Sequence, residues 1–149
     1  PTLKDGSHTI SVKASDNDGN AAAAKTATFT VDTVPPTLQI TAPSNDLITN
    51  KKTVTVSGKT DDVSSKPVTV TVNGATVTVG TDGTFTKDVT LAEGANTITI
   101  VAKDKAGKTT TVTRKVTVDT SAPVIKSVTL TPNPVDCGKT FIIAVEITD

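Results

Sequence analysis

A seven-residue phrase occurs twice in the chain, and this repeat limits the possible folds more than any other feature. The phrase reads TVDTVPP at residues 30–36 and TVDTSAP at residues 117–123. The segments before the two copies also match, because TLKDGSHTISVKASDNDGN (residues 2–20) aligns with TLAEGANTITIVAKDKAGK (residues 90–108) at an offset of 88. A fixed internal period of this kind indicates an array of repeated modules.

The repeat unit is about 87 residues long, the separation of Asp32 and Asp119 in the two phrases. A weaker match between VSGKTD (residues 56–61) and AVEITD (residues 144–149) extends the period downstream. The repeat predicts one complete module at residues 34–120. Residues 1–33 would be the C-terminal strands of a first module, and residues 121–149 the N-terminal strands of a third.

The predicted complete module alternates Thr with Val as strands with one buried face do. Asn73-Gly74 lies between two such runs and favours a tight hairpin turn. Its length suits a seven-stranded sandwich. We therefore predict an all-β, immunoglobulin-like β-sandwich whose inward side chains are Val54, Val56, Val68, Val70, Val72, Val77, Val79, Phe85, Ile98, Ile100, Ala102, Val112, Val116 and Val118.

Two positions interrupt this pattern. Arg114 falls on an apolar face, so we expect it near a sheet edge with its charged head in solvent. The run AAAA at residues 21–24 is the only helix-leaning segment, but its flanks are a turn and an alternating run. We expect it to begin the last strand of the first module.

Charge and composition exclude several functions. Fifteen Lys and Arg residues balance fifteen Asp and Glu residues, so no basic surface for nucleic acid is expected. No apolar run is long enough to insert into a membrane. The single cysteine, Cys137, cannot form an internal disulfide, so the fold must rest on packing. In the loop-like NPVDCGKT it is a candidate surface thiol for pairing between chains.

The combination of LAEGANTITIVAKDKAGK, a Thr/Val-rich last strand and VDTSAPV resembles tandem bacterial immunoglobulin-like modules of secreted and cell-surface proteins. Among these, LQITAPSNDLITNKKTVTVSGKTD is similar to the glucodextranase domain-B type. The resemblance covers essentially the whole chain. It implies an extracellular, secreted or cell-surface location and neighbouring modules of the same protein as partners.

The repeated phrase is then interpreted as the joint between modules. Thr and Val finish one module's last strand, and Pro36 or Pro123 begins the next module with a fixed φ and no backbone donor. Pro35 beside Pro36 stiffens the first joint further. Such joints favour an extended array.

Four acidic residues fall where a joint would bring loops together. Asp32 ends the last strand of the first module, Asp61 and Asp62 lie in the B–C loop of the next, and Asp104 lies in its F–G loop. Carboxylate oxygens are the ligands Ca²⁺ prefers, so this group is a candidate interdomain calcium site and Ca²⁺ the only cofactor considered. The alternative is that each aspartate only shapes its own turn. The DNDGN run at residues 16–20 is interpreted as a hairpin turn.

Catalysis finds no support. The one histidine, His8, has Asn96 as its repeat partner, and there is neither a histidine–cysteine cluster for zinc nor a phosphate-binding loop. Sugar binding would need stacking aromatics, but Trp and Tyr are absent, and we expect Phe29, Phe85 and Phe141 to belong to cores. An isopeptide bond through Lys115 or Lys139 has no spacing to support it.

The sequence thus predicts a non-catalytic spacer, part of a semi-rigid stalk that presents or links other domains. The alternatives are an adhesion or carbohydrate-associated binding module, or a fibre subunit joined by strand exchange between incomplete modules. Polar, Thr-rich outward faces without aromatic anchors argue against a strong protein-binding surface.

Overall fold

The computed structural model describes residues 2–131, 133–134 and 137–149. Its centre is a two-layer sandwich, in which a three-stranded sheet of order β3-β5-β8 faces a five-stranded sheet of order β4-β10-β9-β6-β7. All pairings are antiparallel except that of β4 with β10. The strands are β3 (Thr37–Ala42), β4 (Leu47–Thr49), β5 (Thr53–Asp61), β6 (Thr69–Val72), β7 (Ala75–Val77), β8 (Thr84–Thr90), β9 (Gly94–Lys103) and β10 (Thr109–Val118).

The core lies between these sheets and consists mainly of the predicted inward residues. Its fully buried members include Val56 on β5 and Ile98 and Ile100 on β9, each 0% exposed. Phe85 is also buried, as predicted, but Phe29 and Phe141, which were expected in cores too, are 37% and 51% exposed. Asn73 and Gly74 both have positive φ, of 47° and 80°, and join β6 to β7 as the predicted tight turn. Small β-branched side chains fill most of the space between the sheets, and Phe85 is the aromatic side chain among them.

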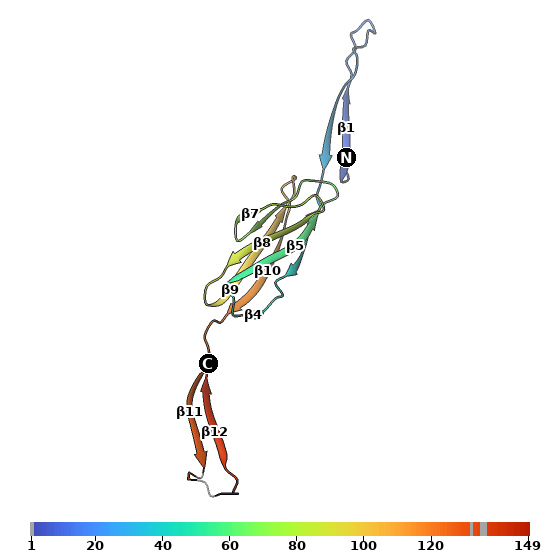
Figure 1. Ribbon diagram of the computed structural model, residues 1–149. Coiled ribbons are helices and arrows are strands. Elements are labelled where there is room, and N and C mark those ends of the chain that lie inside the picture. Colours follow the sequence, from blue (N-terminus) through green and yellow to red (C-terminus); the bar gives the residue numbers. More distant parts are fainter. Residues whose placement is uncertain (1, 132, 135–136) are drawn as a thin grey trace.

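A separate hairpin lies beyond each end of the sandwich, and the three parts follow one another along an elongated molecule (Figure 1). The first hairpin pairs β1 (Gly6–Val12) with β2 (Lys25–Val31), and the second pairs β11 (Val124–Thr131) with β12 (Ile142–Thr148). Each is a two-stranded sheet of its own. Their apolar side chains are largely exposed, because neither hairpin packs against a second layer.

Two further expectations, on residues 21–24 and on Arg114, are wrong. Residues 21–24 do not begin the strand: Ala21 makes an isolated bridge to Ser15, and β2 starts only at Lys25. Arg114 is half-buried, and its guanidinium donates to the carbonyl oxygens of Pro43 and Ile40 at 3.1 and 3.4 Å. Pro43 lies just after β3, where the chain leaves one sheet for β4 in the other, whereas Ile40 lies within β3. The guanidinium therefore binds backbone acceptors at and before this crossing instead of pointing to water.

Among the described residues, no helix has the length and apolar character needed to cross a membrane.

Candidate metal centre at the first joint

Three of the four predicted aspartates meet where the first hairpin joins the sandwich. Asp32 follows the end of β2, Asp62 begins the β5–β6 loop, and Asp104 begins the β9–β10 turn. One carboxylate oxygen from each lies within 4.8 Å of those from the other two. Asp62 and Asp104 are only 6% and 5% exposed, and Asp32 is half-buried. We call these three residues the Asp cluster.

Each carboxylate of the Asp cluster is oriented by a backbone N–H of its own loop. Oδ1 of Asp32 accepts a bond from the N–H of Val34 at 3.1 Å, and Oδ1 of Asp104 accepts one from Lys108 at 2.8 Å. Asp62 Oδ1 accepts two bonds, from Ser64 and Ser65 (2.8 and 2.7 Å). Bonds of this type are why aspartate suits turns, and here they also fix the direction of the second oxygen.

The second oxygens of Asp32 and Asp104 are the unusual atoms of the site. In both residues Oδ2 is buried and has no hydrogen-bond partner among the described residues. A buried carboxylate oxygen without a partner is costly, and three carboxylates in close proximity repel one another. Turn formation alone uses only Oδ1 and gives no reason for the unsatisfied Oδ2 atoms.

Asp61 lies outside the Asp cluster, contrary to the predicted convergence of four residues. Its side chain is 57% exposed and forms an ion pair with Lys66 at 2.9 Å, the one ion pair found across the described residues. The hydrogen bond and charge of Lys66 lower the pKa of Asp61. The alternation of β5 explains the difference, since Thr60 and Asp62 continue the buried face and Asp61 falls on the exposed one.

Ser65 supports the Asp cluster and was not predicted. It is 9% exposed, its Oγ accepts the N–H of Ala106 at 2.9 Å, and its carbonyl accepts that of Lys105 at 3.2 Å. These two bonds tie the β5–β6 loop to the β9–β10 turn and so hold Asp62 beside Asp104. A serine in a polar loop carries no periodic signal that would reveal such a role.

The linker through the joint is fixed on both sides. The Thr33 hydroxyl donates to the carboxylate of Asp5, whose two oxygens each lie 3.0 Å away. Three residues later the carbonyl of buried Pro36 accepts the hydroxyl of Thr110 at 2.6 Å. Only Val34 and Pro35 lie between these two attachments, and proline restricts its own φ.

The second joint repeats the first attachment. The N–H and hydroxyl of Thr120 each donate to Glu93, at 2.8 Å, and Asp119 Oδ1 accepts the N–H of Ser121 at 3.0 Å. The two bonds from Thr120 lower the pKa of Glu93. The sequence repeat therefore corresponds to a repeated contact. In each copy the threonine that follows the aspartate of the joint binds an acidic residue just before the first strand of the hairpin: Thr33 binds Asp5, and Thr120 binds Glu93.

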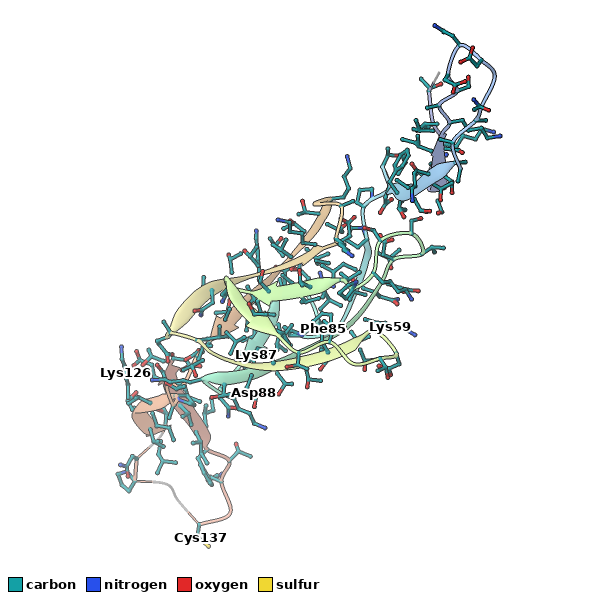
Figure 2. All side chains as sticks on the ribbon, turned by 90° about the horizontal axis from the view of Figure 1, so that it is seen from above. Lys59, Phe85, Lys87, Asp88, Lys126 and Cys137 are labelled. Atoms are coloured by element: carbon teal, nitrogen blue, oxygen red, sulfur yellow. The ribbon has the colours of Figure 1, made fainter. Side chains whose placement is uncertain are left out.

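The other sequence candidates lie elsewhere. His8 donates from Nε2 to the carbonyl of Lys4 at 2.7 Å and stacks on Phe29 with 5.5 Å between ring centroids. Asp16 closes the β1–β2 turn as expected, accepting the N–H groups of Asp18 and Asn20. Cys137 is a free, exposed thiol at the far tip of the β11–β12 hairpin (Figure 2).

A two-layer sandwich with this strand order defines an immunoglobulin-like module. The family model "Glucodextranase, domain B" matches residues 36–120, more than half of the chain. The chain therefore belongs to the glucodextranase domain B family, immunoglobulin-like modules of extracellular proteins. Such domains are accessory modules without catalytic activity of their own, even where the parent protein is an enzyme.

Individual relatives were also found. Bacillopeptidase F of Bacillus subtilis (strain 168) is 34% identical over 123 residues, which cover 83% of this chain and 8% of that protein. The fibronectin(III)-like modules of Clostridium thermocellum CbhA give a TM-score of 0.46 at 21% identity, covering 78% of this chain and 64% of theirs. A tetra-tandem repeat from the extending region of a large adhesion protein gives 0.48 at 24% identity, covering 97% and 46%.

Proposed function

We propose that this chain is part of a semi-rigid extracellular stalk that holds other domains at a distance. The observation that carries the proposal is the first joint, where Thr33 is bound to one side and Pro36 to the other. A linker with two free residues, one of them proline, has little freedom to bend. The repeated Thr120–Glu93 attachment supports the same role at the second joint.

The two hairpins belong to this proposal as parts of neighbouring modules, at residues 1–33 and 121–149. Their exposed apolar side chains need a second sheet, because a two-stranded hairpin is marginal in water. In the sandwich, β9 and β10, which match the first hairpin in the repeat, share one buried core with β3 and β5, which match the second. Neighbouring modules of the parent protein would provide the same cover. The extracellular location rests on the family.

Self-assembly is the second candidate, and the same exposed faces favour it. On β11 and β12, large side chains are 45–70% exposed: Val124, Ile125, Val128, Leu130, Ile142, Ile143, Val145 and Ile147. Faces of this kind on the two hairpins of separate chains would associate head to tail and form a fibre.

Small-angle X-ray scattering of the full chain tests the stalk. We expect an extended particle without the scattering signature of a flexible linker. The double variant Thr33→Val, Pro35→Gly should show that signature, because it removes the attachment and the restricted φ. Thr26→Val, at an exposed threonine within β2, is the matched control and should behave like the unmodified chain. Flexible scattering from the unmodified chain would refute the stalk, and a molecular mass that grows with concentration would favour the fibre.

A further inference from the structure

We propose that the Asp cluster of Asp32, Asp62 and Asp104 binds Ca²⁺ and that the ion ties β2 to the sandwich. The site stands on its own geometry, and only its consequence for stiffness rests on the proposed stalk function. The residues come from three separate segments, two of them loops of the sandwich and one the end of a strand from the first hairpin. A ligand held by all three must cross the joint.

The unsatisfied oxygens indicate a cation rather than a network of turns. Asp104 is 95% buried, yet its Oδ2 has no partner within the part of the chain that the structure describes, and Oδ2 of the half-buried Asp32 has none there either. Across the described residues, the lysine that forms an ion pair, Lys66, binds Asp61 and not the Asp cluster. A divalent cation would satisfy both oxygens and offset the repulsion among the three carboxylates.

The matching turn in the first hairpin shows the same aspartate with both of its carboxylate oxygens hydrogen-bonded. Asp16 is the repeat partner of Asp104, and its Oδ1 accepts the same N–H four residues later. Its Oδ2, however, accepts a bond from the side-chain amide of Asn20 at 2.9 Å. In the sandwich that position is Lys108, and Oδ2 of Asp104 stays without a partner. The aspartate of this turn therefore has hydrogen bonds to both oxygens in the first hairpin, but to Oδ1 alone in the sandwich.

The donor set selects the ion. Three carboxylates provide only oxygen, which suits Ca²⁺ or Mg²⁺ better than zinc, whose usual sites include cysteine or histidine. Calcium tolerates irregular geometry with mixed monodentate and bidentate carboxylates and water. Magnesium demands a near-ideal octahedron. Oxygens spread up to 4.8 Å apart on three independent segments fit the more tolerant ion.

A groove of about 460 Å³ lies beside Asp32, the one member of the Asp cluster among its lining residues, and Lys66 and Lys105 line it as well. Water in such a groove would complete the coordination shell, which for Ca²⁺ takes six to eight oxygens. It also gives the ion a route in, so binding should be reversible by chelator.

Calorimetric titration of the metal-free full chain with CaCl₂ tests the site. We expect one ion per chain, a thermal midpoint raised by calcium and lowered again by chelator, and weaker binding of MgCl₂. Asp32→Asn and Asp104→Asn should each abolish the calcium signal, because an asparagine keeps the Oδ1 acceptor and removes the charge. Asp119→Asn is the matched control: it is the repeat partner of Asp32 with the same local bond, but lies at the second joint, so binding should be unchanged.

Folding of the variants is checked in chelator. Asp104→Asn should there melt at or above the midpoint of the unmodified chain, because it relieves repulsion among buried carboxylates. The proposal is overturned if the unmodified chain binds no calcium, if binding survives unchanged in either Asp32→Asn or Asp104→Asn, or if Asp119→Asn abolishes it. Calcium binding that leaves the scattering of the joint unchanged would keep the site but refute its role in stiffening.

Discussion

Gly83→Ala should destabilise the sandwich more than a matched glycine substitution, and it should also weaken calcium binding. Gly83 precedes β8 with a φ of +82° and Gly74 has a φ of +80°, so alanine is strained equally at both. A Cβ at Gly74 would meet open space, whereas one at Gly83 would collide with the backbone oxygen of Thr60. Backbone cannot move aside as a flexible side chain does, so only Gly83→Ala must displace a strand.

The magnitudes follow from these two terms. A left-handed backbone costs an alanine about 1–2 kcal/mol at either site. Displacing the strand at Gly83 also disrupts the 2.9 Å bond from the N–H of Thr60 to the Gly83 carbonyl. Thr60 is 2% exposed, and leaving a buried N–H unsatisfied costs a further 1–3 kcal/mol or so, about 2–5 kcal/mol in total. The midpoint should fall by about 4–8 °C for each kcal/mol.

Thermal unfolding of Gly83→Ala and Gly74→Ala, followed by circular dichroism in chelator, is the assay. Because Thr60 lies two residues before Asp62 at the end of β5, calorimetry of the same samples should show weaker calcium binding for Gly83→Ala alone. Equal destabilisation by the two variants would refute the collision, and unchanged binding would refute the coupling of this turn to the Asp cluster.

Three further predictions concern the joints and the core. The folded pKa of Glu93 is lowered from its ordinary 4.5, so the stability that its ionised carboxylate contributes is present above that pH and is lost as the pH falls through the lowered pKa. Between about pH 6 and 3 the thermal midpoint should therefore fall less steeply for Glu93→Gln than for the unmodified chain. Equal slopes would contradict the attachment of Thr120 to Glu93. Arg114→Met keeps the aliphatic stem but loses the hydrogen bond to Pro43, and it should lower the free energy of unfolding in chemical denaturation by about 2 kcal/mol. An unchanged free energy of unfolding would mean that the guanidinium lies in solvent and makes no such bond. Ile98→Ala, at a fully buried position, should cost about 2–5 kcal/mol by the same measurement, and a cost below 1 kcal/mol or so would mean a loosely packed core.

The strands and their inward faces could be read from the sequence because each sheet has one buried and one solvated face. Alternating Thr and Val record that environment directly, and the Asn73-Gly74 turn fixes the register between β6 and β7. Residues 21–24 were misassigned because alanine has no side-chain preference strong enough to mark where a strand begins. Arg114 was misplaced because the sheet crossing at Pro43 creates acceptors that no local pattern reveals.

The Asp cluster was only partly predictable, for a similar reason. The repeat located the joint and brought Asp32 near the loops of the sandwich. The sequence alternation of β5 could have shown that Asp62 and not Asp61 belongs to the Asp cluster, since even-numbered residues from Val54 onward face inward. The unpaired oxygens were not predictable, because they depend on which backbone N–H groups each loop presents.

Pulsed electron–electron double resonance across the first joint distinguishes a stiff, ion-tied joint from a flexible one. Spin labels at Thr26→Cys on β2 and Lys87→Cys on β8, both exposed, would be placed in a Cys137→Ser background. We expect a single narrow distance distribution in calcium that broadens in chelator, and for Asp104→Asn we expect the same distribution in both conditions. A broad distribution of the labelled parent in calcium as well as in chelator would contradict a stiff, ion-tied joint.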